Sequence, residues 1–65
     1  MDNKFFNEYT IRIIQLQTKL LSTDYQAIKF AEGELTAEEY RPVKEQRKQW
    51  RQQINELQEK IKSGN

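Results

Sequence analysis

Apolar residues of this 65-residue chain recur at alternating steps of three and four in two separate runs. The first run comprises Phe6, Tyr9, Ile13, Leu16 and Leu20, and the second comprises Tyr40, Val43, Trp50, Ile54, Leu57 and Ile61. Arg47 fills one step of the second run, where an apolar residue is expected. This spacing places each run on one side of an α-helix and is typical of helices that pack along their length. The pattern therefore predicts an all-α fold, an antiparallel helical hairpin that forms a single domain over residues 1–65.

Capping residues set the expected ends of the two helices. Asn3 is a candidate N-cap for a helix that begins near Lys4, because asparagine side chains accept hydrogen bonds from free backbone N–H groups. Gly33 is the expected stop, since glycine readily adopts the left-handed conformation that ends many helices. Thr36 and Glu39 form a capping-box pattern, which predicts that the second helix begins just after Thr36.

Each expected helix contains one possible interruption. Thr23 and Gln26 also form a capping-box pattern, which would start a new helix in the middle of the first. The three-four register nevertheless continues through Thr23, so we favour one long helix, bent or locally capped near Ser22, over two separate helices. Pro42 lacks a backbone N–H and disfavours a helical Arg41. The second helix is therefore either kinked at Pro42 or begins there, after a separate turn.

The cation at Arg47 has a predicted partner. A hairpin that turns between Gly33 and Thr36 brings Leu20 near Arg47, and Asp24 then lies within about one helical turn of the same side chain. We expect Asp24 and Arg47 to form an ion pair. A buried ion pair adds little net stability, but it can fix the register of packed helices.

A second apolar stripe remains after the hairpin is built. Ile14, Leu21 and Ile28 recur every seven residues, and Tyr25 extends the same stripe. One hairpin cannot bury this stripe and the first run together, so we expect self-association into a helical bundle or a partner that covers it. Trp50 is either the largest side chain of the hairpin core or part of that interface, and its position in the second run favours the core. The predicted interface residues are Ile14, Leu21, Tyr25, Ile28 and Trp50.

Composition offers little for catalysis. The chain has no His and no Cys, which removes the commonest general base, the commonest metal ligand and all thiol chemistry. We therefore expect no enzymatic activity, no cofactor and no metal. No apolar run reaches membrane-spanning length, and the opening MDNKFFNEYT lacks a signal-peptide pattern. We expect the protein to act in the cytosol where it is made, or to be built into a particle there, with no membrane partner.

Two clusters of charged residues suggest alternative functions. A basic stripe on the second helix follows steps of three, four and three, as a contact surface for a phosphate backbone would, and consists of Arg41, Lys44, Lys48 and Arg51. A solvated flank of the helical seam is the simpler interpretation of that stripe, because the net charge of the chain is only +1. An acidic cluster surrounds the turn and consists of Glu32, Glu34, Glu38 and Glu39.

The stretch from Leu21 to Leu57 resembles known proteins. It reads Thr23-Asp24-Tyr25, then Glu32-Gly33, then Glu38-Glu39-Tyr40-x-Pro42, then Arg47-x-x-Trp50-Arg51. This pattern resembles small helical segments encoded by tailed bacteriophages and prophages of Gram-positive bacteria, in the region for tail structure and lysis. It is also similar to the C-terminal part of phage tail-fibre assembly proteins. The resemblance implies a phage origin and supplies no catalytic residue.

Three functions follow as expectations. The leading one is a non-enzymatic phage protein, located in the host cytoplasm or the virion, that binds itself or a tail protein through its apolar stripes. The second is a nucleic-acid-binding hairpin dimer, which resembles in outline the plasmid copy-number proteins that hold paired RNA loops on a four-helix bundle. The third is a small inhibitor that presents its acidic turn to a host enzyme.

Overall fold

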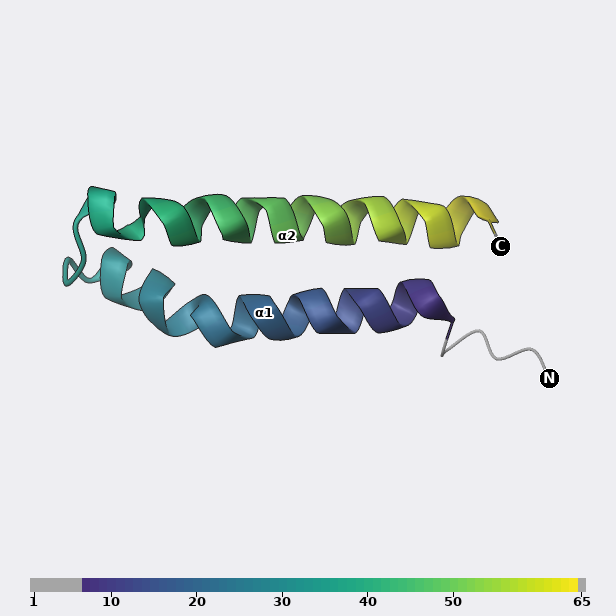
Figure 1. Ribbon diagram of the computed structural model, residues 1–65, viewed down its shortest axis with the longest axis horizontal. Helices are drawn as coiled ribbons and strands as arrows, with labels where there is room; N and C mark the ends of the chain where they lie inside the picture. The colour runs from purple at the N-terminus through teal and green to yellow at the C-terminus, as the bar shows by residue number, and fades with distance from the viewer. Residues whose placement is uncertain (1–6, 65) are drawn as a thin grey trace.

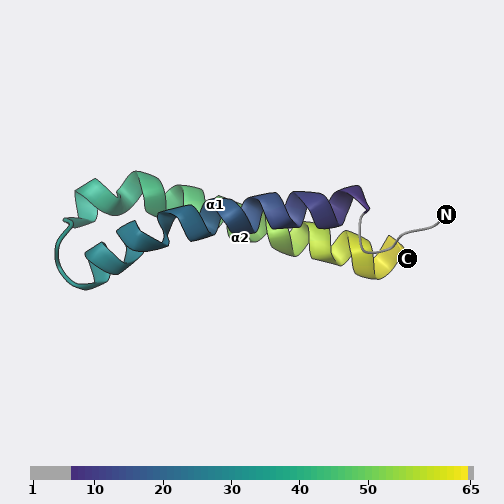
Figure 2. The ribbon, with the colours of Figure 1, turned by 90° about the horizontal axis from the view of Figure 1, so that it is seen from below.

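Two long helices lie side by side and run in opposite directions. The computed structural model describes residues 7–64, in which α1 spans Glu8–Ala31 and α2 spans Ala37–Gly64. The molecule is a rod with principal extents of 49 × 17 × 14 Å. Figure 1 shows the connecting turn at one end of the rod, and Figure 2 shows the two helices crossing at a shallow angle. The predicted all-α antiparallel hairpin is confirmed.

The N-terminus of α1 is capped by Asn7. The Asn7 backbone is extended, and its side-chain oxygen accepts a hydrogen bond from the backbone N–H of Thr10 at 2.8 Å. Glu8 follows in the first turn, where the positive end of the helix dipole stabilises a carboxylate. The predicted cap at Asn3 and the predicted start at Lys4 lie outside the described residues.

The turn between the helices is closed by two local motifs. Gly33 has a φ of +83°, its N–H donates to the carbonyl of Phe30, and the N–H of Glu34 donates to the carbonyl of Lys29. These two bonds form a Schellman motif, which satisfies carbonyls that the end of α1 leaves free. Thr36 and Glu39 form the predicted capping box at the start of α2, with bonds of 2.8 and 3.0 Å.

The first helix is continuous through the predicted interruption. Thr23 does not cap a new helix, because its hydroxyl donates backwards to the carbonyls of Lys19 and Leu20. Ser22 likewise donates to the carbonyl of Lys19. Back-bonded Ser and Thr hydroxyls often bend a helix, and Figure 1 shows α1 changing direction over its second half. The favoured expectation of one long helix is confirmed, and the local cap is corrected to a pair of back-bonds.

The second helix is also continuous. Pro42 lies inside α2, so the alternative in which a separate turn precedes the main helix is wrong. Since proline has no N–H, the carbonyl of Glu38, four residues earlier, receives no helical donor from it. The capping box of Thr36 and Glu39 holds the first turn in helical form on the N-terminal side of this gap.

The core is a thin strip between the helices. Four side chains form its centre, and each keeps 8–9% of its surface exposed: Ile13, Leu16, Ile54 and Leu57. Around them pack Tyr9, Leu20, Trp50 and Ile61. Near the turn, Tyr40 is buried and its ring stacks on Phe30 with centroids 4.6 Å apart. No described side chain is completely buried, which indicates that the core of a single hairpin buries little apolar surface and stabilises the fold only modestly.

Candidate functional site: the outer face of α1

The face of α1 that points away from the hairpin core carries large apolar side chains. Their exposed fractions range from 45% to 70%, and we call this set the outer stripe: Ile11, Ile14, Leu21, Tyr25 and Ile28. Four of them were predicted as interface residues, and the structure leaves all four outside the hairpin core. Ile11 adds one further helical step at the N-terminal end of the stripe, and its position three residues before Ile14 is the sequence signal for it.

The outer stripe lies nearly opposite the core-facing side of α1. At about 100° per residue, the centres of the two sets of side chains are roughly 140° apart around the helix axis. One partner helix cannot cover both sides, and α2 covers only the inner one. The α1 helix is therefore apolar on two faces, as is usual for a helix placed between two neighbours.

Thr18 makes the outer stripe continuous. It lies four residues after Ile14 and three before Leu21, so the stripe with Thr18 follows the three-four alternation of a heptad seam from Ile11 to Ile28. The Thr18 hydroxyl donates to the carbonyl of Ile14 at 2.9 Å. Because the hydroxyl is satisfied within the helix, the residue is compatible with an apolar seam.

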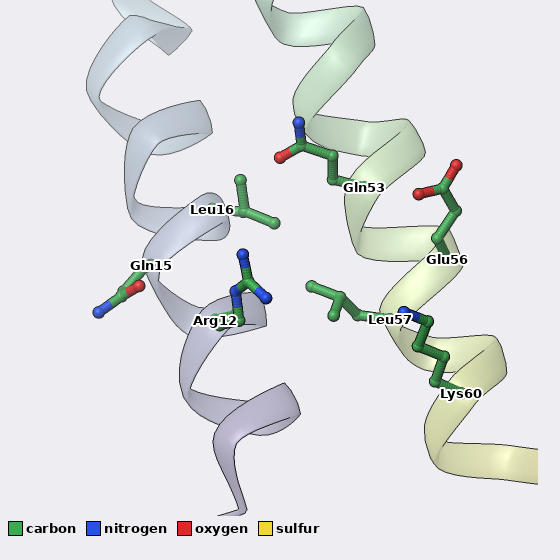
Figure 3. A pocket seen from close by; sticks show the side chains of 7 residues that line it. All are labelled: Arg12, Gln15, Leu16, Gln53, Glu56, Leu57 and Lys60. Atoms are coloured by element: carbon green, nitrogen blue, oxygen red, sulfur yellow. The ribbon is translucent and has the colours of Figure 1, made fainter. Parts of the chain in front are cut away.

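The charged side chains between Ile11 and Ile28 are directed away from the outer stripe, whereas the ammonium of Lys29, just beyond this range, lies 5.4 Å from the Tyr25 ring centroid. Between Ile11 and Ile28 the charged residues are Arg12, Lys19 and Asp24, and all three reach towards α2. Arg12 lines the groove between the helices, as Figure 3 shows. The ammonium of Lys19 lies 6.0 Å from the Trp50 ring centroid, and Asp24 contacts Arg47 on α2. None of the charged residues between Ile11 and Ile28 is therefore directed into the outer face, which only Lys29 approaches, at its C-terminal end. Depletion of charge is the compositional mark of protein-interface cores.

Trp50 belongs to the hairpin rather than to the outer face. It is half-buried on α2, packs against the core cluster and lies beneath the Lys19 ammonium. This placement agrees with the interpretation of Trp50 as a core side chain. Its expected role at an interface stays a prediction, because it lies on the other helix from the outer stripe.

Arg47 joins the two helices through three oxygen atoms of α1. Its Nη1 atom lies 2.9 Å from the carbonyl oxygen of Leu20, 2.7 Å from Thr23 Oγ1 and 3.0 Å from Asp24 Oδ1. The predicted ion pair is confirmed, and the two hydrogen bonds are additions that the sequence pattern did not reveal. Since the Arg47 side chain is only 15% exposed, these bonds also satisfy a cation that is largely shielded from water.

A shallow groove of about 300 Å³ runs along the seam between the helices (Figure 3). Its lining consists of Arg12, Gln15, Leu16, Gln53, Glu56, Leu57 and Lys60. Leu16 and Leu57 belong to the core, so the groove is the edge of the hairpin interface bordered by polar side chains. Its charges are two cations and one carboxylate, which gives the groove no strong preference for an ion of either sign.

The basic stripe is exposed on α2. Its four members are all solvent-accessible, and within residues 7–64 none of them forms an ion pair: Arg41, Lys44, Lys48 and Arg51. They are therefore free to contact an anionic ligand. The sequence expectation that places them on one helix face agrees with their position in α2.

The acidic turn has a structural task of its own. Glu39 accepts a hydrogen bond from the N–H of Thr36, and Glu38 and Glu39 both lie in the first turn of α2. Charge reversal at Glu39, as a test of the inhibitor hypothesis, would therefore also remove the hydrogen bond from the Thr36 N–H, which is half of the capping box.

Neither helix in the described range is long and apolar enough to cross a membrane. Across residues 7–64, no three carboxylate, His or Cys side chains gather closely enough to hold a metal ion. Comparison of the chain with models of protein families, with curated proteins and with solved structures finds no match.

Proposed function

We propose that this chain is a protein–protein interaction module without catalytic activity of its own, and that the outer face of α1 is its contact surface. The single observation that supports the proposal is the outer stripe, whose five apolar side chains keep 45–70% of their surface exposed on a face that has few charges, with Lys29 at one end. Contiguous exposed apolar surface of this kind marks interaction sites in small soluble domains. The asymmetry between the helices supports it further, because the solvent-facing side of α2 is rich in charge.

We also propose a phage setting for this module, as a tail-associated structural or assembly protein. This part rests on the resemblance of residues 21–57 to phage-encoded helical segments. The geometry is compatible with this setting, since a rod-shaped hairpin with one exposed apolar face can dock lengthwise against other helices. Its locations would be the host cytoplasm and the assembled particle.

The test compares two lysine substitutions. Leu21→Lys places a charge in the centre of the outer stripe, while Gln52→Lys places the same charge on the exposed outer side of α2. Full burial of a leucine side chain is worth about 1.5–3 kcal/mol, so Leu21→Lys is expected to weaken binding roughly tenfold or more. Circular dichroism of both variants confirms that the hairpin is folded, since both sites are exposed in it.

The readout is incorporation into particles. Tailed particles released by the strain that encodes the chain are purified, and the chain is quantified in them by mass spectrometry. We expect the wild type and Gln52→Lys in the particles and Leu21→Lys outside them. Equal incorporation of Leu21→Lys would show that the outer stripe is not the contact surface, and absence of the wild type from particles would refute the tail-associated role.

The basic stripe supports a second candidate function, binding of a nucleic-acid backbone by Arg41, Lys44, Lys48 and Arg51. Its supporting observation is that the four cations are exposed and free of ion pairs within residues 7–64. Phosphate binding weakens steeply as salt concentration rises, whereas apolar docking does not. A salt titration of binding to a short RNA duplex separates the two functions, and salt-independent weak binding would dismiss this candidate.

A further inference from the structure

We infer that the partner of the outer stripe is a second copy of this chain, bound with the two α1 helices antiparallel. The inference rests on the proposed function, because it names the occupant of the same surface. In this arrangement one patch contacts its own copy across a two-fold axis, which is the commonest symmetry of protein dimers. The two α2 helices then lie on the outside of a four-helix array, with their charged faces towards water.

The order of side chains along the stripe favours the antiparallel arrangement. Six seam positions, Thr18 included, alternate in steps of three and four, so an antiparallel copy matches every position with one from the other chain. Ile11 then faces Ile28, Ile14 faces Tyr25, and Thr18 faces Leu21. Two of these three pairs set a smaller side chain against a larger one, and the third pairs two isoleucines. A parallel copy would instead align Tyr25 with Tyr25 and Thr18 with Thr18, stacking the bulkiest layer and the only polar layer on themselves.

Charge complementarity at the ends of the stripe points the same way. Glu8 lies in the first turn of α1 and Lys29 in its last turn, and both lie on the same flank of the stripe. The antiparallel arrangement brings Glu8 of one copy beside Lys29 of the other, and the two-fold axis makes this pair twice. In a parallel arrangement Lys29 would face Asp24 of the second copy, a carboxylate already 3.0 Å from Arg47.

The middle of the stripe contains nothing that would repel a second copy. The flanking positions between the two charged ends include Gln15, Gln17 and Ser22, and the charged groups of this part of α1 are directed towards α2. The stripe from Ile11 to Ile28 extends about 25 Å along the helix at 1.5 Å per residue. A helix that lies on an anionic membrane usually flanks its apolar face with several Lys and Arg residues, and within the described part of α1 Lys29 is the only one that flanks the outer stripe.

The mass of the protein in solution is the first test. The chain has a mass of 7.9 kDa, so light scattering over a concentration series is expected to give twice that value. Leu21→Lys is expected to return the mass to that of a single chain, and Gln52→Lys is expected to keep the doubled mass. A wild-type mass of one chain at every concentration overturns the inference.

Engineered cysteines then test the orientation, because the native chain contains none. Ile11→Cys and Ile28→Cys are prepared separately, mixed under reducing conditions and oxidised. A disulfide needs Cα atoms within about 7 Å, which the antiparallel arrangement provides only between position 11 of one copy and position 28 of the other. Two copies of position 11 would be about 25 Å apart.

We expect covalent dimers when the two variants are oxidised as a mixture, and no covalent dimers when either variant is oxidised alone. Covalent dimers of Ile11→Cys alone would show a parallel pair and overturn the inference. A monomeric wild type that enters particles while Leu21→Lys does not would overturn the second-copy inference and leave the proposed function standing. A dimer whose mass Leu21→Lys leaves unchanged would overturn the second-copy inference, and equal incorporation of Leu21→Lys into particles would overturn the proposed function as well.

Discussion

Replacing Arg47 by alanine is expected to destabilise the hairpin more than any single loss of an exposed charge. The Nη1 atom of Arg47 contacts the Leu20 carbonyl, the Thr23 hydroxyl and the Asp24 carboxylate at 2.7–3.0 Å. Hydrogen bonds that involve a charged group contribute about 1.5–3 kcal/mol. The ion pair adds less than about 1 kcal/mol, because Asp24 keeps 46% of its side chain in water. We therefore expect Arg47→Ala to lower the free energy of unfolding by about 2–4 kcal/mol.

Asp24→Ala is the matched comparison. It removes the ion pair but leaves Arg47 with the Leu20 carbonyl and the Thr23 hydroxyl, so its expected cost is below about 1 kcal/mol. Urea unfolding followed by circular dichroism, at one fixed protein concentration, measures both variants. Equal losses for Asp24→Ala and Arg47→Ala would refute the reasoning, because they would show that the carboxylate and not the carbonyl is the principal partner.

Arg47→Leu separates stability from register. The leucine side chain fits the apolar step of the seam, and the Leu20 carbonyl still accepts a hydrogen bond from Thr23 at 3.0 Å. We expect little loss of stability but a broader unfolding transition or an altered solution mass, because the contact that fixes the register is gone. Simple stabilisation of the same fold with an unchanged mass would show that Arg47 does not fix the register.

Two further substitutions address the backbone. Gly33→Ala is expected to lower the free energy of unfolding by about 1 kcal/mol, because the φ of +83° is unfavourable for alanine although the space beside it is open; an unchanged melting temperature would contradict this. Pro42→Ala is expected to raise the free energy of unfolding by about 1–3 kcal/mol, because the new N–H can donate to the Glu38 carbonyl. Thermal unfolding measures the change. A loss of stability would show that packing of the proline ring outweighs the added hydrogen bond.

Much of the fold was accessible from local sequence signals. The stop at Gly33, the capping box of Thr36 and Glu39, and the pairing of Asp24 with Arg47 depend on short spacings and on the register of one hairpin. These features follow from helix geometry alone, and the structure confirms each of them.

Other features depend on contacts that no local pattern encodes. Thr23 and Gln26 satisfy the capping-box pattern as well as Thr36 and Glu39 do, but the Thr23 hydroxyl donates backwards and accepts from Arg47 on the other helix. A residue twenty-four positions away thus takes part in the choice between two local conformations. The pattern located the outer stripe but not the direction of the charges beside it, because side-chain direction is settled by the position of α2.

The end of the rod where the turn joins α1 to α2 affects how the protein folds. The Schellman motif at Gly33 and the stacked rings of Phe30 and Tyr40 join the helices across a connection of only a few residues. Closing so short a loop costs little chain entropy. Once the turn has formed, each further contact between α1 and α2 orders about one more turn of each helix. The two helices can therefore pair progressively from the turn towards the chain ends. A chain with this topology has low contact order and is expected to fold quickly, with its last-formed and first-lost contacts around Tyr9 and Ile61.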